Sequence, residues 1–79
     1  ESGCIVEYID RQKIMCAVVL EVKNQRLRLL TENNREVNLS RKRLLHRDKI
    51  RLDLSLGRDR MVEALKEVVR KRKELINNI

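Results

Sequence analysis

The chain has 79 residues, of which 39% are charged and 42% hydrophobic, and Tyr8 is its single aromatic residue. This length predicts one small domain, whose core has to be built from aliphatic side chains. Two cysteines and two isolated glycines exclude a disulfide-rich scaffold, a four-thiolate zinc site and a glycine-rich phosphate loop. The longest apolar run, at 14–20, is too short for a membrane-spanning helix.

The first forty residues predict four short strands at 3–10, 14–22, 26–32 and 35–39. In the third strand arginines alternate with leucines, which is typical of a strand with one buried face. Asn33 and Asn34 predict a two-residue hairpin loop, because asparagine tolerates the positive φ of a type I′ turn. Four strands at this spacing indicate an antiparallel meander that has to curl to bury its core.

The strand at 14–22 is apolar on both faces. Its even-numbered residues, from Ile14 to Val22, form the stronger face and are predicted to point into the barrel. Its odd-numbered face holds Met15, Ala17 and Val19, which would need a partner if exposed. A strand of this kind is usually covered on both sides.

The basic stretch at 40–48 predicts a tight connection with a short helical turn, anchored by Leu44 and Leu45. Ile50, Leu52 and Leu54 alternate with polar residues and predict a fifth strand. Five short antiparallel strands predict a mainly β fold, with a small SH3-like barrel over 1–55. The predicted barrel core consists of Val6, Val18, Leu20, Leu27, Leu29, Val37, Leu39 and Leu52.

Residues 56–79 predict one long amphipathic helix that begins near Ser55 or Gly57 and leads into further domains. Arg72 interrupts its apolar stripe, so either its aliphatic stem lies along the apolar surface or, as we favour, the helix has left the barrel by that point. The stripe is a candidate interaction face, formed by Met61, Leu65, Val68, Val69, Leu75 and Ile76.

The positive charge is concentrated in the second half of the chain. Residues 1–40 carry six basic and six acidic groups, so the whole formal charge of +7 lies in 41–79. Two basic clusters there flank a nearly neutral segment. This pattern favours a polyanion such as RNA over a merely solvated surface, because Lys and Arg release counterions from phosphate. The candidate RNA-binding residues are Arg41, Lys42, Arg43, Arg47, Lys49, Arg51, Arg70, Lys71 and Lys73.

The sequence contains no evident catalytic or metal-binding set. His46 stands alone in a basic segment, without the nucleophile and acid that a triad needs. Cys4 and Cys16 lack metal-ligand spacing. A turn near residue 11 would place Cys16 opposite Glu7, so no disulfide is expected, and free thiols fit a reducing cytoplasm. We therefore expect a cytoplasmic, non-catalytic chain without a cofactor of its own.

Five short segments of the chain form a recognisable set. They are 3–10 (GCIVEYID), 18–21 (VVLE), 26–32 (RLRLLTE), 35–39 (REVNL) and 42–45 (KRLL). Together they resemble the N-terminal region of bacterial ribonuclease II/R-type (RNB) exoribonucleases. The resemblance implies an SH3-like accessory module, followed by a helical segment and a catalytic domain. It also implies magnesium-dependent 3′-to-5′ hydrolysis of RNA by an aspartate cluster in that domain, a cluster that the aspartates of this chain do not form.

Two functional hypotheses follow. The first is an accessory RNA-binding module of such a ribonuclease, with little sequence preference, because a single tyrosine cannot build a base-stacking platform. The second is a module that docks onto the rest of the parent protein or onto another protein, with homodimerisation through the helix as a corollary. A ribosome- or polymerase-associated SH3-like module stays open as a third interpretation.

Overall fold

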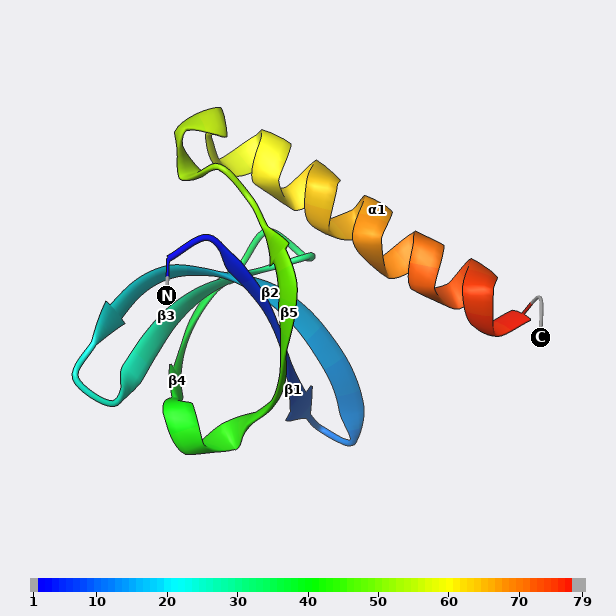
Figure 1. The fold of residues 1–79 in the computed structure, drawn as a ribbon. Coiled ribbons are helices and arrows are strands. Elements are labelled where there is room, and N and C mark those ends of the chain that lie inside the picture. The colour runs from blue at the N-terminus through cyan, green and yellow to red at the C-terminus, as the bar shows by residue number, and fades with distance from the viewer. Residues whose placement is uncertain (1, 78–79) are drawn as a thin grey trace.

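The computed structural model describes residues 2–77, without the side chains at 48–49 and 75–77. Its elements are, in chain order, β1 (Cys4–Asp10), β2 (Lys13–Lys23), β3 (Arg26–Thr31), β4 (Glu36–Ser40), the short 3-10 helix η1 (Arg41–Arg43), β5 (Leu44–Arg51), the short 3-10 helix η2 (Leu54–Leu56) and α1 (Arg58–Asn77). The strands form one antiparallel sheet in the order β4-β3-β2-β1-β5. This sheet curls into a small SH3-like barrel, and α1 crosses its outer face (Figure 1). The predicted mainly β fold with a C-terminal helix is confirmed.

The turn between β1 and β2 has the type I′ geometry that the sequence analysis predicted for Asn33 and Asn34. Asp10 lies opposite Lys13, so Arg11 and Gln12 form a two-residue loop. Both have positive φ, at 50° and 69°, as the central residues of a type I′ turn do. The turn exposes both side chains at the end of the barrel.

The β3–β4 connection departs from its prediction. Only Asn34 has a positive φ, at 61°, so a type I′ turn over Asn33 and Asn34 is wrong. The Thr31 N–H donates to the Arg35 carbonyl at 2.8 Å, which closes a three-residue loop. The Arg35 N–H donates to Thr31 Oγ1 at 3.3 Å, and this local hydrogen bond favours the longer loop.

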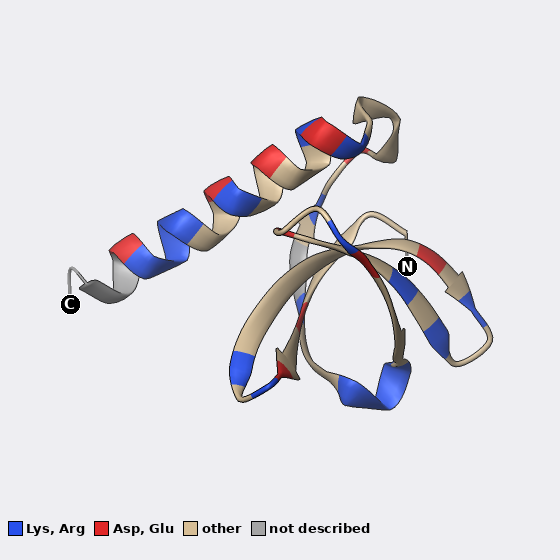
Figure 2. Cartoon of the chain, turned by 180° about the vertical axis from the view of Figure 1, so that it is seen from behind, with Lys and Arg blue, Asp and Glu red and all other residues tan. Residues whose placement is uncertain are grey.

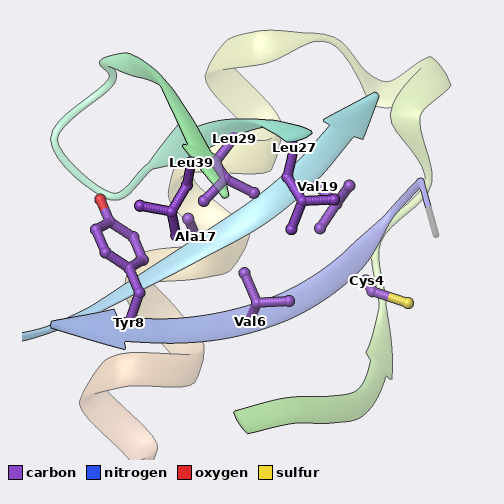
Figure 3. Packing of buried hydrophobic residues seen from close by; sticks show 8 residues of the cluster. All are labelled: Cys4, Val6, Tyr8, Ala17, Val19, Leu27, Leu29 and Leu39. Atoms are coloured by element: carbon purple, nitrogen blue, oxygen red, sulfur yellow. The ribbon is translucent and has the colours of Figure 1, made fainter. Parts of the chain in front are cut away.

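The two faces of β2 contribute to two separate apolar layers. The odd-numbered Ala17 and Val19 fill the barrel interior, whereas the even-numbered Cys16 and Val18 pack beneath α1. Coverage of both faces is therefore confirmed. The predicted orientation is wrong, because α1 supplies a second core on the even-numbered side. The barrel interior consists of Cys4, Val6, Tyr8, Ala17, Val19, Leu27, Leu29 and Leu39 (Figure 3).

Most of the predicted core is buried in one of these two layers. The buried members are Val6, Val18, Leu27, Leu29 and Leu39. Val18 belongs to the layer beneath α1 and not to the barrel interior. Leu20, Val37 and Leu52 are only partly buried and pack at the edges of the layers.

The fifth strand begins earlier than predicted. Leu44 already lies opposite Tyr8, and the strand ends at Arg51, opposite Cys4. The helical turn of the basic connection is limited to η1. The prediction that Leu54 continues the strand is wrong. The Asp53 carboxylate accepts a hydrogen bond from the Ser55 N–H at 2.9 Å, and this local bond starts η2 instead.

The helix α1 begins directly after Gly57, within the predicted start region. Leu65 is fully buried against Ile5 and Cys16. Arg72 Nη1 lies 3.1 Å from Glu7 Oε1 on β1, so the prediction that the helix has left the barrel by this residue is wrong. Arg72 interrupts the apolar stripe because it forms an ion pair at the edge of the second layer.

The opposite end of α1 is fixed by a side-chain clamp. The Arg58 guanidinium donates to the Asn34 carbonyl at 2.8 Å and to Asn34 Oδ1 at 2.6 Å. It also lies 3.1 Å from Glu36 Oε2 on β4. The helix is thus held on the sheet by polar contacts near both ends and by apolar packing between them.

Candidate nucleic-acid interface

The first basic cluster forms η1 at one end of the barrel. Arg41, Lys42 and Arg43 are all exposed there. The Arg41 N–H donates to the Gln25 carbonyl in the β2–β3 turn at 2.8 Å. Arg43 Nη2 donates to the Ile9 carbonyl near the end of β1 at 3.3 Å. These two contacts place η1 between the β2–β3 turn and the β1–β2 turn.

Both neighbouring turns add cations that the sequence analysis did not assign. Figure 2 shows Lys and Arg at η1 and at the two turns, which lie on either side of η1. We call η1 and these two turns the basic rim, and its cations are Arg11, Lys13, Lys23, Arg26, Arg41, Lys42 and Arg43. All seven are exposed, and Asp10 lies among them at the β1–β2 turn. The turn residues were missed because they belong to a half of the chain with no net charge.

The basic residues of β5 extend away from the rim. Arg47 is exposed and lines a hollow next to η1. Arg51 is exposed at the other end of the strand, opposite Cys4. The side chain of Lys49 lies outside the described residues, so its predicted role is neither supported nor contradicted.

The second basic cluster lies on α1, apart from the rim (Figure 2). Arg70 is paired with Glu67, and its Nη1 lies 3.7 Å from Glu74 Oε1. The Glu67 hydrogen bond raises the pKa of Arg70, and the same bond lowers the pKa of Glu67. Lys71 and Lys73 are exposed. The fold does not bring the two predicted basic clusters together on one surface.

The predicted interaction face of the helix is largely occupied by its own sheet. Met61 and Leu65 are buried, and Val68 and Val69 are partly buried against the layer beneath α1. Met61 and Leu65 therefore contact the sheet of their own chain and do not form a free surface. The remaining members, the side chains of Leu75 and Ile76, lie outside the described residues.

A pair of exposed apolar side chains lies on β1 and β2. Ile9 and Ile14 are directly opposite each other and are 46% and 65% exposed. Ile14 also lines a groove between the sheet and α1, together with Val69 and Lys73. The sequence does not reveal this pair, because the strongly apolar even-numbered face of β2 predicts a position inside the barrel.

The thiols are buried and unpaired. Cys16 lies opposite Glu7 as predicted, and Cys4 and Cys16 do not form a disulfide. Burial raises the pKa of Cys16, and the Arg72 guanidinium partly opposes this shift. Within residues 2–77, no three His, Cys, Asp or Glu side chains of the described set gather as metal ligands. No described helix combines the length and apolar character needed to cross a bilayer.

Comparison with known proteins adds no relative. No family model, curated protein or solved structure matches the chain.

Proposed function

We propose that the chain is a non-catalytic RNA-binding module that holds the RNA backbone on the basic rim with little sequence preference. The observation that carries this proposal is the convergence of η1 and its two neighbouring turns. Seven exposed cations there come from three separate segments, η1 and the two turns that it contacts. Cations gathered in this way displace counterions from consecutive phosphates.

The state of these cations supports the proposal. The ion pairs of the described residues involve Arg28, Arg58, Arg70 and Arg72. None of these four arginines belongs to the rim. Arg43 contacts a backbone carbonyl, which leaves its charge uncompensated. The rim cations therefore keep their full charge for an external anion.

The position of Tyr8 supports a phosphate-based mode of recognition. Its side chain is buried in the barrel interior, and burial raises the pKa of its hydroxyl. The single Phe, Tyr or Trp ring of the chain is thus not available to stack on bases. We accordingly expect weak sequence selectivity and strong salt dependence.

The proposed biological setting is that of an accessory module in a ribonuclease II-type exoribonuclease. This part of the proposal rests on the sequence resemblance alone. In that setting the magnesium-dependent cleavage would belong to a separate catalytic domain. The sequence continuing beyond Ile79 in the gene is its direct test, since a clustered set of catalytic aspartates would support it and their absence would contradict it.

Fluorescence anisotropy with a labelled oligoribonucleotide tests RNA binding. We expect weak binding at low salt, with a slope of log affinity against log salt of about −2 to −4, at about −0.7 per phosphate contacted. Changing Arg41, Lys42 and Arg43 to Ala should flatten this slope by up to about 2 without unfolding the barrel. These three side chains are exposed, so their loss removes little packing.

A matched variant controls for total charge. Changing Arg35, Arg60 and Lys66 to Ala also removes three exposed cations, but none of them lies on the rim. We expect this variant to keep most of the wild-type salt slope. An equal flattening of the salt slope in both variants would mean that net charge, and not the rim, determines binding. No binding at low salt would contradict the proposal as a whole.

A docking function is the second candidate, and the exposed Ile9–Ile14 pair favours it. Two isoleucines side by side on a sheet form an apolar surface of the kind that partners cover. Sedimentation of the wild-type chain and of an Ile9→Thr, Ile14→Thr variant tests self-association through this pair. A wild-type dimer that the variant abolishes would support docking, whereas two monomers would speak against a second copy as the partner.

A further inference from the structure

The hollow beside η1 is formed by a local irregularity of β5. Glu7 lies opposite His46, whereas the next residue of β1, Tyr8, lies opposite Leu44. Leu45 is therefore an extra residue in the strand, a bulge that re-aims the neighbouring side chains. Leu44 turns toward the barrel interior, whereas Leu45 is 55% exposed.

The bulge gives the hollow a specific set of groups. It is lined by Arg41, Leu44, Leu45, His46 and Arg47. Two arginines, Arg41 and Arg47, thus border one small space, with the exposed aliphatic Leu45 beside them. Glu7, across the sheet from His46, is already paired with Arg72 at 3.1 Å. In the described part of the chain, no carboxylate forms an ion pair with Arg41 or Arg47.

This arrangement differs from the rest of the basic surface. The rim cations come from separate turns, which suits a series of phosphodiesters with one charge each. The hollow concentrates its donors around a single position. A terminal phosphomonoester carries about −1.5 to −2 at neutral pH and offers three acceptor oxygens. Arginine binds such a group through paired N–H donors.

We propose that this hollow binds a terminal phosphate of RNA, with Arg41 and Arg47 as its charged donors and Leu45 against the attached nucleoside. The proposal rests on the proposed RNA-binding function and adds a preference for one type of RNA end. The rim then holds the backbone that leads away from the phosphorylated end.

The experiment compares otherwise identical oligouridylates by anisotropy, using the full chain at one low salt concentration. One pair carries a 5′-phosphate or a 5′-hydroxyl, with the label at the 3′ end. A second pair carries a 3′-phosphate or a 3′-hydroxyl, with the label at the 5′ end. We expect one phosphorylated end to bind about five- to tenfold more tightly than its hydroxyl counterpart, since solvent weakens charge-assisted hydrogen bonds at an exposed site.

Two substitutions with the same loss of charge locate the effect. Arg47→Gln, within the hollow, should bring the phosphate-to-hydroxyl affinity ratio close to one. Arg26→Gln, on the rim but outside the hollow, should weaken both oligonucleotides in parallel and keep the ratio. Both arginines are exposed, and thermal melts check that both variants stay folded. A ratio that falls equally in both variants would overturn the subsite.

The outcomes separate the two proposals. Equal affinity for all four ends in the wild-type chain would overturn the terminal-phosphate site and leave RNA binding by the rim intact. No binding of any oligonucleotide would overturn both. Competition then distinguishes an RNA end from free phosphate. We expect uridine monophosphate to displace the oligonucleotide at lower concentration than inorganic phosphate. Equal potency of the two competitors would contradict a nucleoside contact at Leu45.

Discussion

The basic rim and the basic end of α1 look alike in the sequence, as two short runs of Lys and Arg, but the fold treats them differently. On the rim, η1 lies between two turns from distant parts of the chain, and their cations add up on one surface. On α1, Arg70 is paired within the helix with Glu67 and Glu74. The same kind of charge run in the sequence therefore yields two different surfaces, one joined by cations from other segments and one partly neutralised within its own helix.

The helix cluster stays apart from the rim only if α1 is firmly docked, because an undocked helix could bring its cations close to the rim. The layer beneath α1 provides this docking through Leu65, which is fully buried. The Arg58 clamp and the Arg72–Glu7 pair fix the direction in which the helix runs.

The largest expected effect is that of Leu65→Asp. Burying an unpaired carboxylate and losing the leucine contacts should cost roughly 3 kcal/mol or more. A small domain has about 5 kcal/mol of stability, so the variant should keep about 2 kcal/mol or less and unfold at a clearly lower temperature. Circular dichroism melts measure this loss. Leu56→Asp is the matched control, because Leu56 is 42% exposed in η2 and should change the melt little.

The result also tests whether the barrel and helix share one stability. A single transition at lower temperature would mean that the two apolar layers unfold together. A barrel that stays folded after loss of the helical signal would contradict this, and the rim would then be independent of α1.

The sequence predicted the first four strands well because each carries its own local signal. Alternation identified the third strand, and the change to a period of three and four identified the helix near its observed start at Arg58. The orientation of β2 could not be predicted in the same way. Both its faces are apolar, and only the position of α1 decides that Val19 points into the barrel and Val18 beneath the helix.

A smaller effect is expected for Arg72→Ala, which removes the ion pair with Glu7. Both side chains are partly exposed, at 30% and 25%, so the loss in stability should be about 1 kcal/mol or less. A double-mutant cycle with Glu7→Gln isolates the pair, and Lys71→Ala controls for removal of a neighbouring exposed cation. Additive effects of the two substitutions would mean that the ion pair contributes nothing to docking.

The candidate site was predictable only where its cations are neighbours in sequence. Arg41, Lys42 and Arg43 form a visible run, and the structure places them together in η1. Arg11 and Lys23 join them through the β1–β2 and β2–β3 turns, and the close approach of η1 to those turns depends on tertiary hydrogen bonds. The bulge at Leu45 is likewise invisible in the sequence, because it results from the register between β1 and β5.

A still smaller effect is expected when the helix cluster is removed. Changing Arg70, Lys71 and Lys73 to Ala lowers the formal charge by the same amount as the η1 triple variant. Because the helix cluster lies apart from the rim, RNA affinity should stay close to that of the wild type, and so should the salt slope. Anisotropy under the same conditions measures both. A slope as flat as that of the η1 variant would show that RNA also contacts α1, and the contrast between the two clusters would fail.

The smallest expected effect concerns pH and the local pairing on α1. The hydrogen bond from Arg70 lowers the pKa of Glu67 below its ordinary value of about 4.5. The folded helix therefore favours the ionised carboxylate, and this contribution is complete above that value. This contribution to stability is lost as the pH falls below about 4.5 and passes through the lower pKa of Glu67 in the folded state. Both groups are exposed, so we expect only a slight decrease in helical ellipticity. In Glu67→Gln this acid-dependent part should disappear, since glutamine does not titrate. Parallel acid curves for the two chains would mean that Arg70 is not neutralised by Glu67, and the helix cluster would then resemble the rim more closely than its contacts indicate.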